Sequence, residues 1–325
     1  MTYKRIADLA HVSLSTVSKA LSGSSEISRE LKERIIKIAI EQGYFSEKNR
    51  LRRDNTDNQS IGIAVICPEI ISVTYSHAIT NIKNEIELMG GTASVYMHDF
   101  DTDKMNKLIK IITVRRSADG IIVFPTDGEI MTTTIPTVAI SSKANCDTVY
   151  CDVAAYFDEI VEYLKDMGHS EIAFVGEKYT MEKLRAYKRS IEKYGILYRS
   201  ENVYVIDGRF EKIGYEAADM MIKSNHLPTA VICAYDEVAL AMIHRFSENG
   251  IKVPETVSIV GINDIPSAQY LSIPLTTVKT FNEDLGRIAV GVLYDKIFEK
   301  DSAVRHVTVK HEFIKRKTVC RCKEI

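Results

Sequence analysis

From residue 61 onward, short apolar runs alternate with longer amphipathic stretches, and this alternation limits the possible folds more than any other feature. The apolar runs are four to seven residues long, as expected of buried β-strands: IGIAVIC, TASVYM, GIIVF, TVAI, EIAFVG, VYVI, TAVICA and VSIVGI. The stretches between them have the apolar spacing of helices, as in SHAITNIKNEIELMG and FDEIVEYLKDMGH. Strands that alternate with helices predict parallel sheets wound with crossover helices.

These units are too many for one sheet of ordinary size, so we expect two lobes with a cleft between them. The expected core spans 61–325. Its first lobe would comprise 61–153 and 279–309, and its second lobe 154–278 and 310–325.

Residues 1–44 predict three short helices, and the second of them, within VSLSTVSKALSG, has an unusual surface. Its inward face carries Val17, Ala20 and Leu21. Its other face carries Leu14, Ser15, Ser18, Lys19 and Ser22, and Ser13 can cap its start. Short polar side chains at the start of an exposed helix allow close approach to base edges in the major groove of DNA. An ordinary capped helix with a serine-rich exposed face would show the same pattern.

Residues 45–60, FSEKNRLRRDNTDNQS, are polar and charged and predict a linker. Its stretch KNRLRR places four cations in six residues. Residues 1–60 hold 11 Lys+Arg against 8 Asp+Glu, whereas the whole chain has a net charge of −2. The basic balance of this part slightly favours a nucleic-acid partner.

Composition and the first residues argue against several classes of protein. Hydrophobic residues make up 45% and charged residues 26%, as in globular rather than disordered chains. No apolar run approaches the roughly 20 residues needed to cross a bilayer, and MTYKRIADLAHVS lacks the apolar segment of a signal peptide. We therefore expect a cytoplasmic protein without a membrane partner.

The six cysteines have no C-x-x-C spacing, and two of them sit inside apolar strand-like runs, where buried thiols explain them better than a disulfide framework. Cys320 and Cys322, without histidines nearby in the sequence, make a poor zinc site, so we expect no metal and no cofactor. The sequence contains no G-x-S-x-G, no glycine-rich phosphate loop and no H-E-x-x-H, which disfavours an enzyme.

The segment IADLAHVSLSTVSKALSGSSEISRELKERIIKIAIEQGY resembles the DNA-binding headpiece of the LacI/GalR family of bacterial transcription repressors, whose pattern is V-A-x-x-A-G-V-S-x-x-T-V-S-R-x-L-N. The likeness continues in DMGHSEIAFVG, in AYDEVALAMIHRFSENGIKVPETVSIVGIND and in IPLTTVKTFNEDLGRIAV. The resemblance implies an all-α helix-turn-helix headpiece followed by an α/β core of two doubly wound parallel-sheet lobes, similar to periplasmic binding proteins. It also implies a homodimer that binds double-stranded operator DNA and a small-molecule effector.

The resemblance implies that Ser13, Leu14, Ser15, Thr16, Lys19 and Ser22 contact DNA. Lys19 stands where the family usually has an arginine, and Ser22 where it usually has an asparagine. Because lysine lacks the bidentate fork that suits guanine, we expect a phosphate contact or a single hydrogen bond from Lys19. These two differences affect which operator sequence we expect the protein to bind, but not the expectation that it binds DNA.

The linker departs further from the family, whose hinge inserts a leucine into the minor groove. That leucine falls on Arg53, and Leu51 lies two residues away. An arginine suits a narrow, electronegative minor groove, whereas a shifted register would bring Leu51 to the wedge position. Together with Arg50, these residues are the expected DNA contacts of the linker.

Five residues are candidates for effector binding: Tyr75, Phe124, Arg185, Tyr235 and Asn263. Arg185 matches the family's ligand-binding arginine, whose fork holds sugar hydroxyls or a carboxylate, although a solvent-exposed helical arginine is the other interpretation. Asn263 stands where the family usually has an aspartate. Phe124 and Tyr75 lie where strands end and turns follow, and Tyr235 replaces an asparagine of the family. The three rings favour stacking on a sugar ring or another flat ligand, although core packing explains each of them equally well by itself.

We therefore predict a sequence-specific transcriptional regulator, most simply a repressor, whose operator affinity is controlled by a sugar or sugar derivative. The alternative is a solute-binding or sensor protein with a vestigial headpiece, which would need export. The sequence does not distinguish an inducer from a corepressor, because either ligand shifts the DNA-binding equilibrium through the same linkage.

Overall fold

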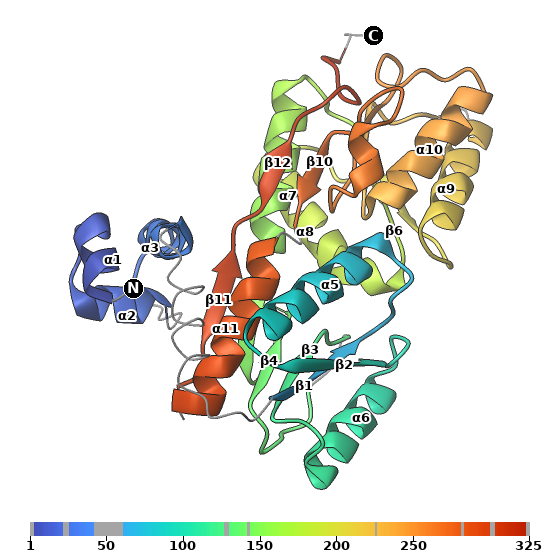
Figure 1. Ribbon diagram of the computed structural model, residues 1–325. Helices are drawn as coiled ribbons and strands as arrows, with labels where there is room; N and C mark the ends of the chain where they lie inside the picture. The colour runs from blue at the N-terminus through green and yellow to red at the C-terminus, as the bar shows by residue number, and fades with distance from the viewer. Residues whose placement is uncertain are drawn as a thin grey trace. The chain divides into compact units, whose positions relative to one another are not determined.

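The computed structural model of the chain describes residues 3–21, 26–41, 61–126, 130–141, 144–224, 226–280, 283–299 and 303–322. The chain forms two compact units (Figure 1). Unit 1 comprises Met1–Cys151 and Phe281–Lys310, and unit 2 comprises Asp152–Thr280 and His311–Ile325. The chain thus passes between the units three times, so neither unit is one continuous segment.

Three helices form the N-terminal bundle: α1 (Tyr3–Ala10), α2 (Leu14–Leu21) and α3 (Arg29–Glu41). Their buried residues form a core of Ile6, Ala7, Ala10, Val17, Ala20, Ile35 and Ala39. The predicted inward face of α2 is confirmed by Val17 and Ala20. In α1, Ala7 is buried, whereas Leu9 is 46% exposed and does not belong to this core.

Serine caps begin the second and third helices. The Thr16 backbone N–H donates a hydrogen bond of 3.1 Å to Ser13 Oγ, which confirms the predicted cap. The Leu31 backbone N–H donates a longer bond of 3.4 Å to Ser28 Oγ in the same way. These bonds satisfy backbone donors that have no partner within a helix.

The sheet of unit 1 has six parallel strands in the order β11-β5-β4-β3-β1-β2. Their bounds are β1 (Gly62–Cys67), β2 (Thr92–Met97), β3 (Gly120–Val123), β4 (Thr137–Ala139), β5 (Asp147–Cys151) and β11 (His306–Val309). The helices of this part are α5 (Val73–Leu88), α6 (Thr102–Arg115) and α11 (Glu283–Glu299).

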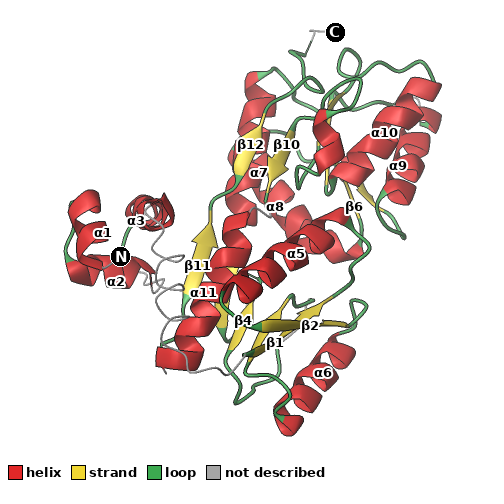
Figure 2. Cartoon of the chain, viewed as in Figure 1, coloured by secondary structure: helices red, strands yellow, loops and turns green. Residues whose placement is uncertain are grey.

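Alternate residues of β1 face opposite sides of this sheet, as the period of a strand requires. Ile63 and Val65 join a core that includes residues of α5 and α11, whereas Ala64 and Ile66 join a core that includes residues of α6. The sheet is therefore covered on both faces, which explains why its strands are continuous apolar runs (Figure 2).

The main sheet of unit 2 has four parallel strands in the order β7-β6-β8-β9. Their bounds are β6 (Ile172–Gly176), β7 (Val203–Val205), β8 (Ala230–Cys233) and β9 (Ser258–Val260). The helices are α7 (Val153–Asp166), α8 (Met181–Lys193), α9 (Glu211–Lys223) and α10 (Asp236–Glu248). A separate antiparallel pair joins β10 (Thr277–Lys279) to β12 (Glu312–Ile314).

Both parallel sheets are doubly wound, and the predicted fold class is confirmed. In each sheet the first strand lies between the second and the third along the chain, so the winding reverses beside it: between β1 and β3 in unit 1, and between β6 and β8 in unit 2. Ligands of such sheets bind at the carboxyl ends of the strands on either side of this reversal.

All eight apolar runs identified in the sequence form strands. The sequence analysis missed β5, β10, β11 and β12, which have three to five residues each and contain charged or polar residues. Such short segments give no periodic signal, and their pairing with distant strands decides their conformation.

Candidate effector site and DNA-contacting helix

The exposed face of α2 carries the residues predicted to contact DNA. Leu14 is 52% exposed, and Ser15 and Lys19 are also exposed, whereas Thr16 is half-buried. The hydroxyl of Ser13 lies 2.8 Å from those of Ser15 and Thr16, so these three side chains are held together at the start of the helix. A small, ordered polar surface results.

Lys19 forms an ion pair with Glu26, a residue that the sequence analysis did not single out. Lys19 lies in α2, which ends at Leu21, and Glu26 lies between α2 and α3, so the two residues do not share a helix whose spacing would predict their contact. The predictions for Ser22, Arg50, Leu51 and Arg53 lie outside the residues that the structure describes.

In unit 2, a hydrogen bond between two side chains links the loops on either side of the winding reversal. Glu177 directly follows β6, and Tyr235 lies just after β8. The Tyr235 hydroxyl donates to Glu177 Oε1 at 3.2 Å. The Glu177 side chain is 1% exposed, and burial raises the pKa of its carboxyl above the ordinary value. The structure thus places Tyr235 at the carboxyl edge of the sheet, as predicted from its position after a strand.

Two cations adjoin this hydrogen bond. Lys183, on α8, donates from Nζ to the Ala234 carbonyl at 2.6 Å, and Nζ lies 4.4 Å from the centre of the Tyr235 ring. Arg209, which follows β7, has its Nε 3.5 Å from Glu177 Oε1. Burial lowers the pKa of the Lys183 ammonium to about 8, although nearby carboxylates oppose the shift.

Aromatic rings complete the group. The Arg209 guanidinium lies 4.3 Å from the centre of the Phe210 ring and 5.7 Å from that of Tyr179. The rings of Phe210 and Tyr235 meet edge to face at 5.2 Å. Phe210 has φ = 49° and ψ = −122°, a strained backbone conformation of the kind that collects at functional sites. We call Glu177, Lys183, Arg209, Phe210 and Tyr235 the carboxyl-edge cluster.

Arg185 is not part of this cluster. It lies on α8, two residues beyond Lys183, and its side chain is exposed. Residues two apart on a helix point in directions about 200° apart, so the two cations serve different sides of α8. The structure brings Lys183, rather than the predicted Arg185, to the carboxyl edge of the sheet.

Asn263 lies after β9 and is 8% exposed. Its Oδ1 accepts a hydrogen bond of 2.9 Å from Thr280 Oγ1, and its backbone N–H donates to the Val278 carbonyl at 2.7 Å. Its φ of 118° is unusual for a residue other than glycine. These bonds hold the loop after β9 against the end of β10.

Asp236, which begins α10, is a buried residue that forms hydrogen bonds at the same edge of the sheet. Its fully buried carboxylate accepts hydrogen bonds from Thr277 Oγ1 at 2.5 Å and from the Ile265 backbone at 2.7 Å. Burial is the largest influence on this group and raises its pKa to about 7. Asp236 therefore ties the loop after β9 to the start of β10 and to α10.

Tyr75 and Phe124 meet at the carboxyl edge of the sheet in unit 1. Tyr75 lies in the first turn of α5, which follows β1, and Phe124 directly follows β3. Their rings pack edge to face at 5.8 Å, and the ring of Phe100 lies 6.2 Å from that of Tyr75. The structure brings the two predicted residues together and adds Phe100, which the sequence analysis missed.

His98 supports this aromatic group. It is fully buried, and its Nε2 lies 3.0 Å from the Phe124 carbonyl oxygen. Burial lowers the pKa of the imidazole, which favours the neutral ring at neutral pH. His98 therefore acts on Phe124 through the backbone, as a neutral hydrogen-bonding group.

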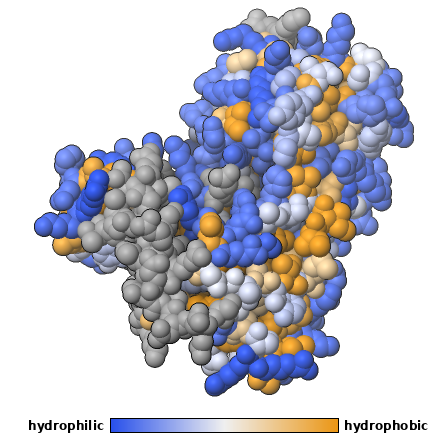
Figure 3. All heavy atoms as spheres, in the orientation of Figure 1, coloured by the Kyte–Doolittle hydropathy of each residue, from blue (hydrophilic) through white to orange (hydrophobic). Residues whose placement is uncertain are grey.

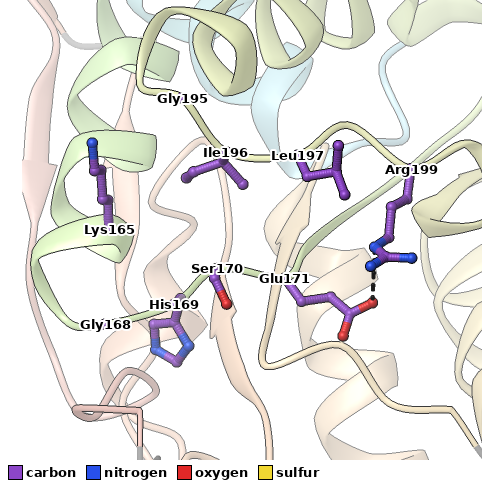
Figure 4. Close-up of a pocket in the computed structure, with 9 residues that line it drawn as sticks. All are labelled: Lys165, Gly168, His169, Ser170, Glu171, Gly195, Ile196, Leu197 and Arg199. Carbon is purple, nitrogen blue, oxygen red and sulfur yellow. Dashed lines mark ion pairs between the residues drawn. The ribbon is translucent and has the colours of Figure 1, made fainter.

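A pocket of about 520 Å³ lies at the opposite, amino edge of the sheet in unit 2 (Figure 4). It is lined by Lys165, Gly168, His169, Ser170, Glu171, Gly195, Ile196, Leu197 and Arg199. Its charged groups already have partners within the chain: Lys165 Nζ donates to the Tyr194 carbonyl at 2.7 Å, and Glu171 accepts from Asn202 and contacts Arg199. Because this pocket lies at the other edge of the sheet, it is separate from the carboxyl-edge cluster.

All six cysteines are free thiols, and the sequence did not predict a disulfide framework. Within the described part of the chain, no group of three or more histidine, cysteine or acidic side chains is arranged to hold a metal ion. No helix among the described residues is both long and apolar enough to span a membrane.

Comparison with known proteins identifies two regions of the chain that match family models. Residues 2–47 match the family of bacterial regulatory proteins, lacI family, and residues 161–319 match a periplasmic binding protein-like domain. The chain is 28% identical over 335 residues to the HTH-type transcriptional repressor PurR of Vibrio atlanticus, and the alignment covers 98% of each chain.

Two solved structures illustrate the shared fold. The lac repressor dimer bound to operator and the anti-inducer ONPF matches with a TM-score of 0.74 at 21% identity, covering 98% of this chain and 99% of that one. The complex of transcriptional regulator CelR with cellobiose matches with a TM-score of 0.69 at 19% identity and the same coverage.

A helix-turn-helix headpiece in front of a periplasmic-binding-protein-like core defines a class of bacterial transcription regulators. The chain belongs to the LacI family of bacterial regulatory proteins. It is a DNA-binding transcriptional regulator, from a family of regulators rather than enzymes.

Proposed function

We propose that the protein is a homodimeric repressor that binds a pseudo-palindromic operator. A small molecule that binds its core raises or lowers the affinity for this operator. The observation that carries the proposal is the polar surface of α2, with Ser15, Ser18 and Lys19 exposed while Val17 and Ala20 are buried. A helix with one apolar face fixed in a bundle can enter the major groove with its other face.

The effector is held by the carboxyl-edge cluster of unit 2 together with Asn263 of the same unit. The aromatic pair Tyr75 and Phe124, at the carboxyl edge of the sheet in unit 1, is a separate candidate contact. Lys183 takes the role that the sequence assigned to Arg185, because Lys183 reaches the carboxyl edge and Arg185 is exposed elsewhere on α8. Both Lys183 and Arg209 lie over aromatic rings. One face of the Tyr235 and Phe210 rings is therefore occupied, so hydrogen bonds and charge contribute more to recognition than the ring stacking expected from the sequence.

A carbohydrate or sugar derivative is the first candidate effector, since hydroxyl groups suit the donors and acceptors of Lys183, Glu177 and Asn263. The cellobiose bound to CelR supports this choice by fold alone. A purine-related molecule is the second candidate, favoured by PurR relatives that match over 98% of their length. Both classes offer several hydrogen-bonding groups in one plane or ring.

Dimerisation is supported by apolar residues on unit 1. Strand β2 is an edge of its sheet, and Val95 and Met97 point to the same side and are 43% and 45% exposed. Leu88, at the end of α5, is 64% exposed. Apolar patches interrupt the hydrophilic surface in the part of Figure 3 that holds α5 and β2. An edge strand with exposed apolar residues is a ready surface for a second copy.

DNA binding is tested by fluorescence anisotropy of full-length protein with DNA from upstream of its own gene, against a scrambled competitor at several salt concentrations. We expect sequence-selective binding that weakens as salt rises, because phosphate contacts release counterions. Ser15→Glu on α2 should abolish binding by charge repulsion, whereas Ser170→Glu, on an exposed site in unit 2, should not. Equal affinity for both DNAs would favour the solute-binding alternative.

The effector site is tested by the thermal unfolding midpoint in the presence of cellobiose, ribose, guanine or adenine. A ligand that binds the folded chain raises this midpoint. We expect Lys183→Met to remove the stabilisation and the matched variant Arg185→Met, from the same helix, to keep it. The reverse result would return the effector-binding role to Arg185.

A further inference from the structure

The headpiece presents a cation and an anion side by side next to the exposed face of α2. Lys19 and Glu26 form an ion pair whose side chains are 50% and 66% exposed. The Lys19 side chain holds the pKa of the Glu26 carboxyl below its ordinary value through a hydrogen bond and opposite charge. Glu26 is therefore negatively charged at neutral pH.

This ion pair by itself contributes little to folding. An ion pair between two exposed side chains contributes little to stability, and the core of the bundle is built from other residues. A carboxylate beside a DNA-binding helix also opposes binding, since it repels phosphates. A negative charge in this place favours binding where it accepts hydrogen bonds that the bases donate.

Lys19 lies on the same face of α2 as Ser15 and Ser18, because residues three and four apart share a side of a helix. Glu26 is held at the tip of the Lys19 side chain, so its carboxylate belongs to the same surface. The two side chains thus offer a donor and an acceptor next to each other.

A G·C pair offers the complementary pattern in the major groove. Guanine presents O6 and N7 as acceptors, and cytosine presents its N4 amino group as a donor beside them. Lysine donates to the guanine acceptors, and glutamate accepts from the cytosine amino group. A·T pairs present the amino group and the acceptors in a different order, so the same two side chains do not match them equally well.

We propose that Lys19 and Glu26 together recognise one G·C pair in each operator half-site, with Lys19 donating to guanine and Glu26 accepting from cytosine. The inference rests on the proposed function, because it takes α2 as the helix that enters the groove. It makes Glu26 a specificity-determining residue, and it gives Lys19 a base to contact despite the missing fork of arginine.

A simple counter-ion would behave differently from a residue that contacts a base. If Glu26 only neutralises Lys19, its removal frees a cation for phosphates and strengthens binding to every sequence alike. If Glu26 accepts from cytosine, its removal weakens discrimination at one base pair and leaves the preferences at the other positions in place. The sequence preference of a Glu26 variant therefore distinguishes the two roles, whereas its overall DNA affinity does not.

The experiment is selection of bound sequences from a random double-stranded DNA library by the full-length protein, followed by sequencing. The variants are Glu26→Gln, Lys19→Met and the control Glu30→Gln. Glu30 is exposed in the first turn of α3, so its substitution changes the net charge by the same amount as Glu26→Gln.

We expect the wild-type motif to contain a G·C position at which Glu26→Gln and Lys19→Met each lose roughly tenfold in discrimination. Glu30→Gln should select the wild-type motif. The inference is overturned if Glu26→Gln selects the wild-type motif unchanged, or if the two variants relax different positions. A wild-type protein that selects no motif would instead overturn the proposed function, so the two failures are distinguishable.

Discussion

The Tyr235 hydroxyl donates a hydrogen bond of 3.2 Å to the Glu177 carboxylate and so joins the two loops beside the winding reversal in unit 2. Glu177 also accepts from the Tyr179 backbone at 3.2 Å and lies 3.5 Å from the Arg209 guanidinium. One buried carboxylate therefore orients both a phenol and a cation within the proposed effector site. Such preorganisation lowers the entropic cost of binding.

Tyr235→Phe removes this hydrogen bond while it keeps the ring between Lys183 and Phe210. Because a neutral donor to a charged acceptor contributes about 1.5–3 kcal/mol, we expect effector affinity to fall by roughly tenfold or more. DNA affinity without effector should not change. Isothermal titration with the effector found in the thermal screen measures the loss.

The matched control for this prediction is Tyr270→Phe, which removes a hydroxyl from a tyrosine that is 80% exposed. It should leave effector affinity as it is in the wild type. If both substitutions had equal effects, the bond between Tyr235 and Glu177 would have no part in effector recognition.

The sequence could indicate that Tyr235 lies at a strand end, but it could not indicate its partner. Glu177 and Tyr235 are 58 residues apart, and only the parallel pairing of β6 with β8 brings them together. Likewise, the choice between Lys183 and Arg185 depends on the rotation of α8 about its axis. That rotation is set by the packing of Leu184 and Tyr187 into the core.

The fold was more predictable than the site because its signal is repeated along the chain. Apolar runs such as GIIV and SIV are buried on both faces of a parallel sheet, and this burial is visible in each run by itself. The strands that escaped prediction, such as β11 with its sequence HVTV, depend on a neighbour far away in the chain. β11 pairs with β5 across about 150 intervening residues, and no local pattern reports that contact.

The stability of the chain should depend on pH above about pH 8 through Lys183. Burial lowers the pKa of Lys183 from 10.5 to about 8, so between these values the folded chain binds fewer protons than the unfolded chain. The free energy of unfolding therefore rises with pH across this window. Urea unfolding of the wild type and Lys183→Met at several pH values measures the slope, which the variant should lose. An identical slope in both proteins would contradict the prediction.

Gly214 allows α9 and α10 to pack closely. A Cβ at this position would lie 2.4 Å from the Val238 carbonyl oxygen, which belongs to the backbone and cannot move aside alone. We expect Gly214→Ala to lower the free energy of unfolding by about 1–3 kcal/mol, as overpacking of a core does. In the control Gly62→Ala the new Cβ meets only Asp119, at 3.9 Å, and urea unfolding should show a much smaller change.

Lys296 and Asp147 form a buried ion pair in unit 1. Lys296 Nζ lies 3.3 Å from Asp147 Oδ2, and the two side chains are 10% and 8% exposed. Asp147 Oδ1 accepts a further hydrogen bond of 2.8 Å from the Arg305 backbone. Burial raises the pKa of the Asp147 carboxyl, and the positive charge of Lys296 opposes that shift.

Lys296→Met should therefore leave a buried carboxylate without its cation, and we expect the free energy of unfolding to fall by about 3–5 kcal/mol at neutral pH. Loss of the cation raises the pKa of Asp147 further, so the folded chain holds its proton to higher pH than the unfolded chain. The loss of stability should thus grow as the pH rises through that pKa and shrink in mild acid.

The comparison is Lys83→Met, which breaks an ion pair with Glu87 on the surface of α5. Its side chains are 49% and 52% exposed, so its removal should cost less than about 0.5 kcal/mol. Urea unfolding of both variants at about pH 5 and pH 8 measures the two effects. Equal losses for Lys296→Met and Lys83→Met would mean that solvent already screens Asp147, and a loss that is independent of pH would mean that packing rather than charge is responsible.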